Sequence, residues 1–122
     1  MKNIYFSEMN NTNRWEVYLP YVWGVLRASA EQNPQINEEY FWNAPFFYPE
    51  SVESIVSRIE NPTVFGFSCY VWNWTLHLEL SKKVKEKFPD CLIVFGGPQV
   101  PKDDISFFKK FPWVDILVHG EG

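Results

Sequence analysis

Short apolar runs alternate with amphipathic stretches along this chain of 122 residues. Five runs have the length and the β-branched or aromatic content of strands: 2–7, 36–41, 63–70, 91–95 and 116–119. Four stretches repeat apolar residues with helical spacing: 20–32, 52–59, 73–88 and a short one that Asp103 or Asp104 caps. Strands that alternate with helices predict an α/β fold with a parallel sheet and helices on both faces. The more polar run 36–41 is expected at the sheet edge.

The run from Leu92 to Phe95 is apolar at every position, which is typical of a central parallel strand covered on both faces. Gly96, Gly97 and Pro98 follow it directly. Glycine allows positive φ or the close approach of another group, and proline ends the hydrogen-bond ladder. Ligands of open α/β sheets bind at the carboxyl ends of strands. The turn therefore indicates either a ligand crevice or a plain strand-to-helix turn that needs glycine for its geometry alone.

The length of the chain indicates one domain, residues 1–122, with a single core. No helix is predicted after the last strand, so one face of the sheet should be partly bare. We therefore expect these residues to be part of a longer protein or to be covered by a neighbour. The aromatic loop 42–48 is interpreted as a contact surface for another domain or subunit, and the alternative is an aromatic cluster folded back on the core.

Composition excludes several classes of function. The net charge of -4 and a pI near 5.1 argue against binding to nucleic acid. No run is long and apolar enough for a membrane span, and no leader is present, so a cytoplasmic location is expected. Cys69 and Cys91 should lie more than about 10 Å apart, too far for a disulfide, and they form no metal-binding cluster with the two histidines. His77, in a helix, is interpreted as a packed or solvated residue.

The first loop excludes the common nucleotide-binding domains. No Gly-x-Gly-x-x-Gly follows the first strand, because Gly24 is the first glycine of the chain. The loop is also a poor match to a flavodoxin phosphate loop, and the acidic pair of a phospho-receiver is absent. No P-loop or Gly-x-Ser-x-Gly elbow occurs.

Four stretches together carry a family resemblance: LPYVWGVLRASAE, GFSCYVWNW, VFGGPQVP and VDILVHGEG. In this order and spacing, the chain resembles the N-terminal cobalamin-binding domain of corrinoid-dependent radical S-adenosylmethionine proteins. The resemblance implies a flavodoxin-like, Rossmann-like doubly wound sheet of five parallel strands in the order 2-1-3-4-5, with the last helix missing. It also implies that the corrin ring lies over the carboxyl ends of the strands.

The resemblance also suggests cofactor-binding residues. Leu19 and Pro20 would approach the corrin at the head of the first helix, and Gly96 with Gly97 would leave room for the nucleotide tail. The full set that the resemblance implies is Leu19, Pro20, Ser68, Tyr70, Trp72, Asn73, Gly96, Gly97, Pro98, Gly120 and Glu121.

Two departures from the family limit the prediction. No Asp-x-His-x-x-Gly motif follows the first strand, so cobalt would have no lower histidine ligand from this loop, or the domain has lost the cofactor and serves as a docking module. No Cys-x-x-x-Cys-x-x-Cys motif is present either. Methyltransferase-like chemistry with S-adenosylmethionine and an iron–sulfur cluster would therefore belong to a C-terminal radical domain outside these residues. That domain, and a second copy of the fragment at high concentration, are the expected partners.

Overall fold

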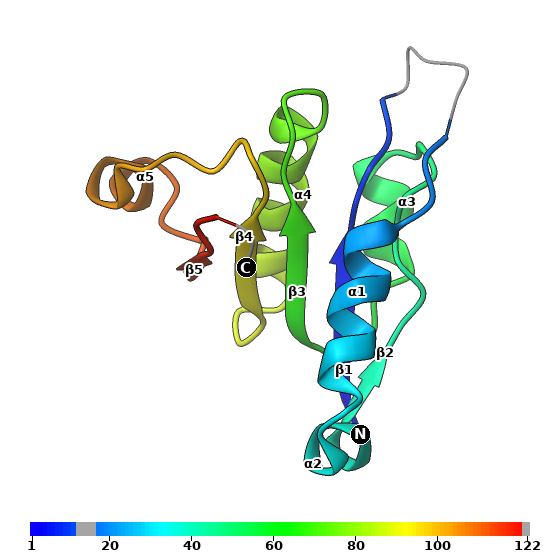
Figure 1. Cartoon of the computed structure of the whole chain (residues 1–122). Helices are drawn as coiled ribbons and strands as arrows, with labels where there is room; N and C mark the ends of the chain where they lie inside the picture. Colours follow the sequence, from blue (N-terminus) through cyan, green and yellow to red (C-terminus); the bar gives the residue numbers. More distant parts are fainter. Residues whose placement is uncertain (12–16, 121–122) are drawn as a thin grey trace.

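A computed structural model describes residues 1–11 and 17–120 of the chain. Its centre is one sheet in the order β2-β1-β3-β4-β5, in which every neighbouring pair of strands is parallel (Figure 1). The strands are β1 Lys2–Ser7, β2 Tyr40–Trp42, β3 Pro62–Ser68, β4 Leu92–Gly96 and β5 Ile116–Leu117. This order confirms the flavodoxin-like α/β fold that the resemblance implied.

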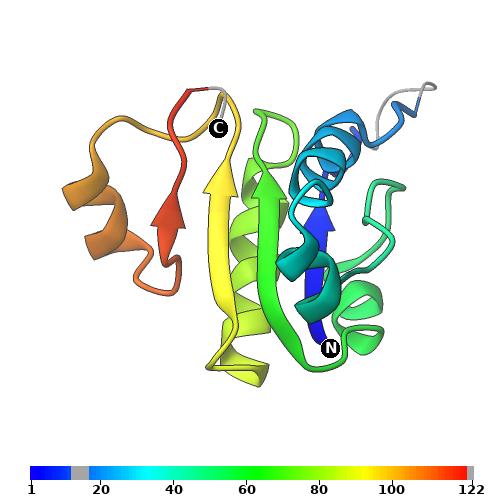
Figure 2. The same cartoon turned by 60° about the horizontal axis from the view of Figure 1, so that its bottom comes forward.

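The helices cover the two faces of the sheet unequally (Figure 2). They are α1 Tyr21–Ala30, α2 Pro34–Glu39, α3 Val52–Ser57, α4 Trp74–Lys87 and α5 Asp104–Lys110. Helices α3 and α4 pack on one face, which we call the covered face. Helix α1 lies on the other, the open face, over the β1 side of the sheet, and leaves β3 and β4 bare there (Figure 1). In the described part of the chain, no helix has the length and apolar content to cross a membrane.

The core lies between the sheet and the helices of the covered face. Strand residues alternate between faces, so every second side chain points into this layer. Phe65 stacks on Phe67 with ring centroids 4.5 Å apart, and Phe67 contacts Phe95 at 5.1 Å. Side chains of the sheet and of α3 and α4 that are fully buried here include Phe65, Phe67, Phe95, Ile93, Ile55, Leu80 and Val84.

The predicted strand 36–41 is wrong in position. Residues 34–39 form helix α2, which begins with a hydrogen bond from the backbone N–H of Gln35 to the side chain of Asn33 at 3.0 Å. The predicted helix 20–32 was expected to end before Asn33-Pro34, but these residues are the cap and first residue of a new helix, where proline fits because its N–H is not needed. Strand β2 follows this helix, and its place at the sheet edge is confirmed. The ends of the other predicted elements differ from the observed ones by no more than two residues.

Two apolar segments are covered on one side only. In α5, Ile105 is 74% exposed, whereas Phe107 is buried against Phe95 and Trp74. In β4, Phe95 is fully buried but Leu92 is 38% exposed. An apolar run therefore does not show that both faces of its strand are covered.

The aromatic loop 42–48 is partly folded back on the core. Phe46 is buried, and its ring stacks near Tyr5 and Phe65, with centroids 6.3 and 6.1 Å away. Its backbone N–H donates to the carbonyl of Phe6 at 2.9 Å, so the loop continues beside β1. Interpreting the whole loop as a contact surface was wrong for Phe46, whereas Tyr48 is 66% exposed.

The two cysteines form no disulfide, as the sequence predicted, and both are buried. Cys69 directly follows the end of β3, whereas Cys91 directly precedes the start of β4. Because these strands run parallel side by side, the two thiols lie at opposite ends of the sheet.

Candidate functional site

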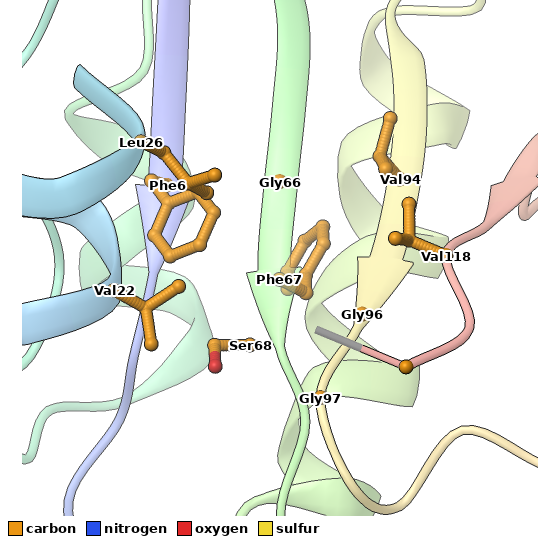
Figure 3. Close-up of a pocket in the computed structure, with 11 residues that line it drawn as sticks. Phe6, Val22, Leu26, Gly66, Phe67, Ser68, Val94, Gly96, Gly97 and Val118 are labelled. Atoms are coloured by element: carbon orange, nitrogen blue, oxygen red, sulfur yellow. The ribbon is translucent and has the colours of Figure 1, made fainter. Parts of the chain in front are cut away.

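An apolar groove of about 310 Å³ opens on the open face of the sheet (Figure 3). Val22 and Leu26 of α1 form one wall, and Val118, just after β5, lies on the opposite side. Phe6 and Val94 lie between these walls. The groove exists because α1 covers only the β1 side of this face.

The strand register explains the floor of the groove. Phe6 of β1 is paired with Gly66 of β3, and Gly66 with Val94 of β4, so the three share one row and one face. A Cβ atom at Gly66 would lie 2.6 Å from Cδ2 of Phe6, so the phenyl ring occupies the space above this glycine. The next row on the same face pairs Ser68 with Gly96, which places a hydroxyl and an open backbone at the carboxyl end of the groove.

The two glycines of the turn after β4 have different surroundings. A Cβ atom at Gly96 would meet only Cβ of Val118, at the ordinary contact distance of 3.7 Å. Gly97 has φ +96°, and a Cβ atom there would lie 2.5 Å from the carbonyl oxygen of Cys69. The loops after β3 and β4 therefore need glycine at position 97 to pack together, whereas Gly96 leaves free space toward the groove.

The loop after β3 carries a rigid aromatic pair. The rings of Tyr70 and Trp72 stack with centroids 4.6 Å apart and an angle of 6° between their planes. The indole N–H of Trp72 donates to the carbonyl of Met9 at 3.0 Å. Asn73 is almost fully buried: its Oδ1 accepts from the N–H of Tyr70 at 2.8 Å, and its Nδ2 donates to the carbonyls of Met9 and Ser68, each at 3.1 Å. Asn73 therefore holds this loop in shape, while Trp72 remains 48% exposed.

The segment that enters α1 exposes apolar side chains at the same edge of the sheet. Leu19 and Tyr21 are 79% and 78% exposed, and Tyr18 is also exposed. Pro20 is the residue that precedes the first turn of the helix. Val71 and Trp72, in the loop after β3, are exposed as well, and we call these exposed side chains near the carboxyl ends of β1 and β3 the apolar rim.

The structure brings only part of the predicted set together. Ser68, Gly96, Gly97 and Gly120 line the groove, and Gly97 and Gly120 also border a second hollow that contains Pro98. Other members lie elsewhere: Trp72 and Asn73 border a separate cavity near Met9, Leu19 and Pro20 lie at the head of α1, and Tyr70 stacks on Trp72. Glu121 lies outside the described residues.

Sequence reasoning missed the apolar lining of the groove. Phe6, Gly66 and Val94 belong to three strands that were predicted, and the alternation of strand side chains puts them on one face. The signal available was the glycine inside the third strand, since glycine in a strand often marks a close approach of another group. Which face was open could not be known before the helices were placed.

A buried polar cluster lies on the other face, beneath the loops of the site. Nε2 of His77 is 2.9 Å from Oγ of Ser7, and Nδ1 is 3.6 Å from Sγ of Cys69. Burial lowers the pKa of His77 to about 3, so the ring is neutral, and burial raises the pKa of the Cys69 thiol well above its usual range. His77 is thus a packed residue, as the sequence predicted. No three His, Cys, Asp or Glu side chains within the described ranges gather into a possible metal site.

Comparison with known proteins identifies two relatives, and no family model matches the chain. One is 2-(S-pantetheinyl)-carbapenam-3-carboxylate methyltransferase of Streptantibioticus cattleyicolor, and the other is the cobalamin-dependent radical SAM methyltransferase TokK of Streptomyces tokunonensis. Each is 40% identical to this chain over 121 residues. The alignments cover 99% of this chain but only 17% of each relative. They confirm the resemblance that the sequence motifs indicated.

Proposed function

We propose that residues 1–122 form the cobalamin-binding domain of a cobalamin-dependent radical S-adenosylmethionine methyltransferase. The observation that carries this proposal is the 40% identity to TokK over 99% of the chain. The flavodoxin-like sheet supports it, because open α/β sheets bind ligands at the carboxyl ends of their strands. When bound, the corrinoid would supply its methyl group or its cobalt to chemistry that other parts of the full protein perform.

The groove on the open face fits the nucleotide tail of a corrinoid. Its lining is mostly apolar, as small-ligand sites usually are, and Ser68 adds a hydroxyl at the carboxyl end. We propose that the tail enters between α1 and Val118, past Gly96, where no side chain stands in the way.

The apolar rim fits the flat corrin ring. Leu19, Tyr21 and Trp72 are exposed at the carboxyl edge, and a ring lying across them would remove this surface from water. Tyr70 stiffens the rim because it stacks on Trp72. This is the placement of the ring that we propose, and the family resemblance implied the same one.

The histidines of the chain do not suggest a lower ligand to cobalt from the first loop. His77 lies in α4 and is fully buried, and Nε2 of His119 is 2.7 Å from Oδ1 of Asp104. The chain contains only two cysteines, so the iron–sulfur cluster and S-adenosylmethionine would bind in a radical domain of the same protein. We propose that this domain contacts the open face, where Leu92 and Ile116 are exposed.

Titration with hydroxocobalamin, followed by visible absorbance, tests the proposal. Gly96→Val should weaken binding roughly ten- to a hundredfold, because overpacking a site typically costs about 1–3 kcal/mol. Gly24→Val is the matched control, since a Cβ atom at Gly24 would meet nothing within 4 Å. This control should bind like the wild type.

The outcomes distinguish whether the protein binds cobalamin from whether the nucleotide tail enters the groove. If the protein with its natural flanking sequence binds no hydroxocobalamin, the cofactor-free docking module becomes the better explanation. If it binds, but Gly96→Val binds equally well with its fold intact, the tail does not enter the groove. Circular dichroism of each variant provides the check on folding.

A further inference from the structure

Helix α1 forms a wall of the groove, although its own residues contribute little to fixing it in place. None of its residues is buried. It begins after Pro20 without a side-chain cap and has no acidic residue in its first turn. The N–H groups of a first helical turn need partners outside the helix, and a negative charge is favourable there. The hydrogen-bond acceptor and the negative charge are therefore expected to come from a residue outside α1.

Glu8, one residue beyond β1, supplies both a hydrogen-bond acceptor and a negative charge to the first turn of α1. Its carboxylate accepts a hydrogen bond from the backbone N–H of Trp23 at 2.5 Å, and the neighbouring backbone N–H of Val22 also favours its charged form and lowers its pKa. The backbone of Glu8 is itself fixed, because its N–H donates to the carbonyl of Phe46 at 2.9 Å. Glu8 thus connects the carboxyl end of β1 to the first turn of α1.

Asn10 holds the chain just before the helix. Its Oδ1 accepts from the N–H of Tyr18 at 2.7 Å, and its Nδ2 donates to the carbonyl of Tyr18 at 3.0 Å. The same Nδ2 lies 2.7 Å from the carbonyl of Phe47, and Asn10 is almost fully buried. All these bonds go to backbone atoms, so they fix the path of the chain whatever side chains it carries.

We propose that Glu8 is a positioning residue that, together with Asn10, fixes the head of α1 to β1 and so sets the wall of the ligand groove. Glu8 binds the backbone N–H of Trp23, and the adjacent residue Val22 lines the groove. Glu8 does not line the groove, so its effect on a ligand would pass through α1. Burial raises the pKa of the Glu8 carboxyl, while the two backbone N–H donors oppose that shift. The inference rests on the proposed function only where it concerns cobalamin.

Hydrogen–deuterium exchange, read by mass spectrometry on peptides covering 17–26, tests the position of α1 without any ligand. In Glu8→Ala, exchange there should rise roughly ten- to a hundredfold, since hydrogen bonds to charged groups are strong. Glu8→Gln keeps an acceptor oxygen and should restore most of the protection. The matched control is Asp103→Ala, which removes the carboxylate that caps α5 by accepting from the N–H of Ser106. It should raise exchange in α5 alone.

The affinity of the same variants for hydroxocobalamin tests whether the position of α1 affects ligand binding. Glu8→Ala should bind about tenfold more weakly, Glu8→Gln nearly as well as the wild type, and Asp103→Ala as well as the wild type. Unchanged exchange at 17–26 in Glu8→Ala would overturn the inference, and so would a rise shared equally by peptides of β3. If the wild type binds no cobalamin while the exchange result holds, the proposed function fails and the positioning role of Glu8 stands.

Discussion

The two faces of the sheet are built from the same strands but differ in what covers them. On the covered face, Phe65, Phe67 and Phe95 are at most 1% exposed beneath α3 and α4. On the open face, Val94 is only partly buried, and α1 contributes no buried residue. From this difference we expect the covered face to supply most of the stability, while the open face retains free space.

Truncating one aromatic residue of the covered face should produce the largest effect. Phe65→Ala should lower the free energy of unfolding by about 3–5 kcal/mol, because it leaves a cavity in a closed core. Val94→Ala, on the open face, should cost about 1 kcal/mol or less, since its side chain is only partly buried. Urea unfolding of both variants makes the comparison. Equal losses would contradict the division between the faces.

Lowering the pH should reduce the free energy of unfolding, because His77 is buried on the covered face. Its pKa is about 3 in the folded protein and about 6.5 when unfolded, so the unfolded chain takes up a proton that the folded state excludes. The contribution of His77 to the free energy of unfolding is therefore fully present above pH 6.5. Between pH 6.5 and 3, the free energy of unfolding falls by about 1.4 kcal/mol for each pH unit. In His77→Gln, the unfolding free energy should depend less on pH in this window. Parallel pH curves for the two proteins would refute this account.

The neighbouring glycines of the turn should respond differently to the same substitution. Gly97→Ala should destabilise the fold by about 1–3 kcal/mol, because φ is positive and Cys69 lies too close. Gly96→Ala should change stability by less than about 0.5 kcal/mol, since its new methyl group faces the groove. Thermal unfolding distinguishes the two. A stable Gly97→Ala protein would show that the close approach to Cys69 is not required.

A modest gain in stability is expected on α1. Gly24→Ala should stabilise the protein by about 0.5–1 kcal/mol, because alanine favours the helix and its methyl group meets nothing within 4 Å. Denaturant titration at high precision measures this gain. A loss of stability would mean that α1 lies closer to the sheet than described.

Local signals in the sequence were sufficient to predict most of the helices and strands. Asp103 or Asp104 was predicted as a helix cap, and Asp103 does accept a hydrogen bond from the N–H of Ser106; Ser51 caps α3 in the same way. The alternation of strands and helices was sufficient for a parallel sheet, because few other topologies satisfy it. The strand order itself came from the family resemblance and is confirmed.

Other features depend on contacts between distant residues and could not be predicted locally. Asn33-Pro34 can end one helix or begin another, and both readings satisfy local rules. Leu92 and Phe95 are equally apolar, and only the placement of α4 determines which is covered. The role of Asn73 depends on the carbonyl of Met9, 64 residues away in sequence, so no motif could reveal it.

The sheet order also has a consequence for synthesis on the ribosome. Strand β1 ends at Ser7, but its neighbours are β2, which begins at Tyr40, and β3, which ends at Ser68. At roughly 5–20 residues per second, the nascent β1 remains unpaired for several seconds. Its apolar side chains, Ile4 and Phe6 among them, are accessible during that time, so the emerging chain is a natural client for a chaperone that binds short extended segments.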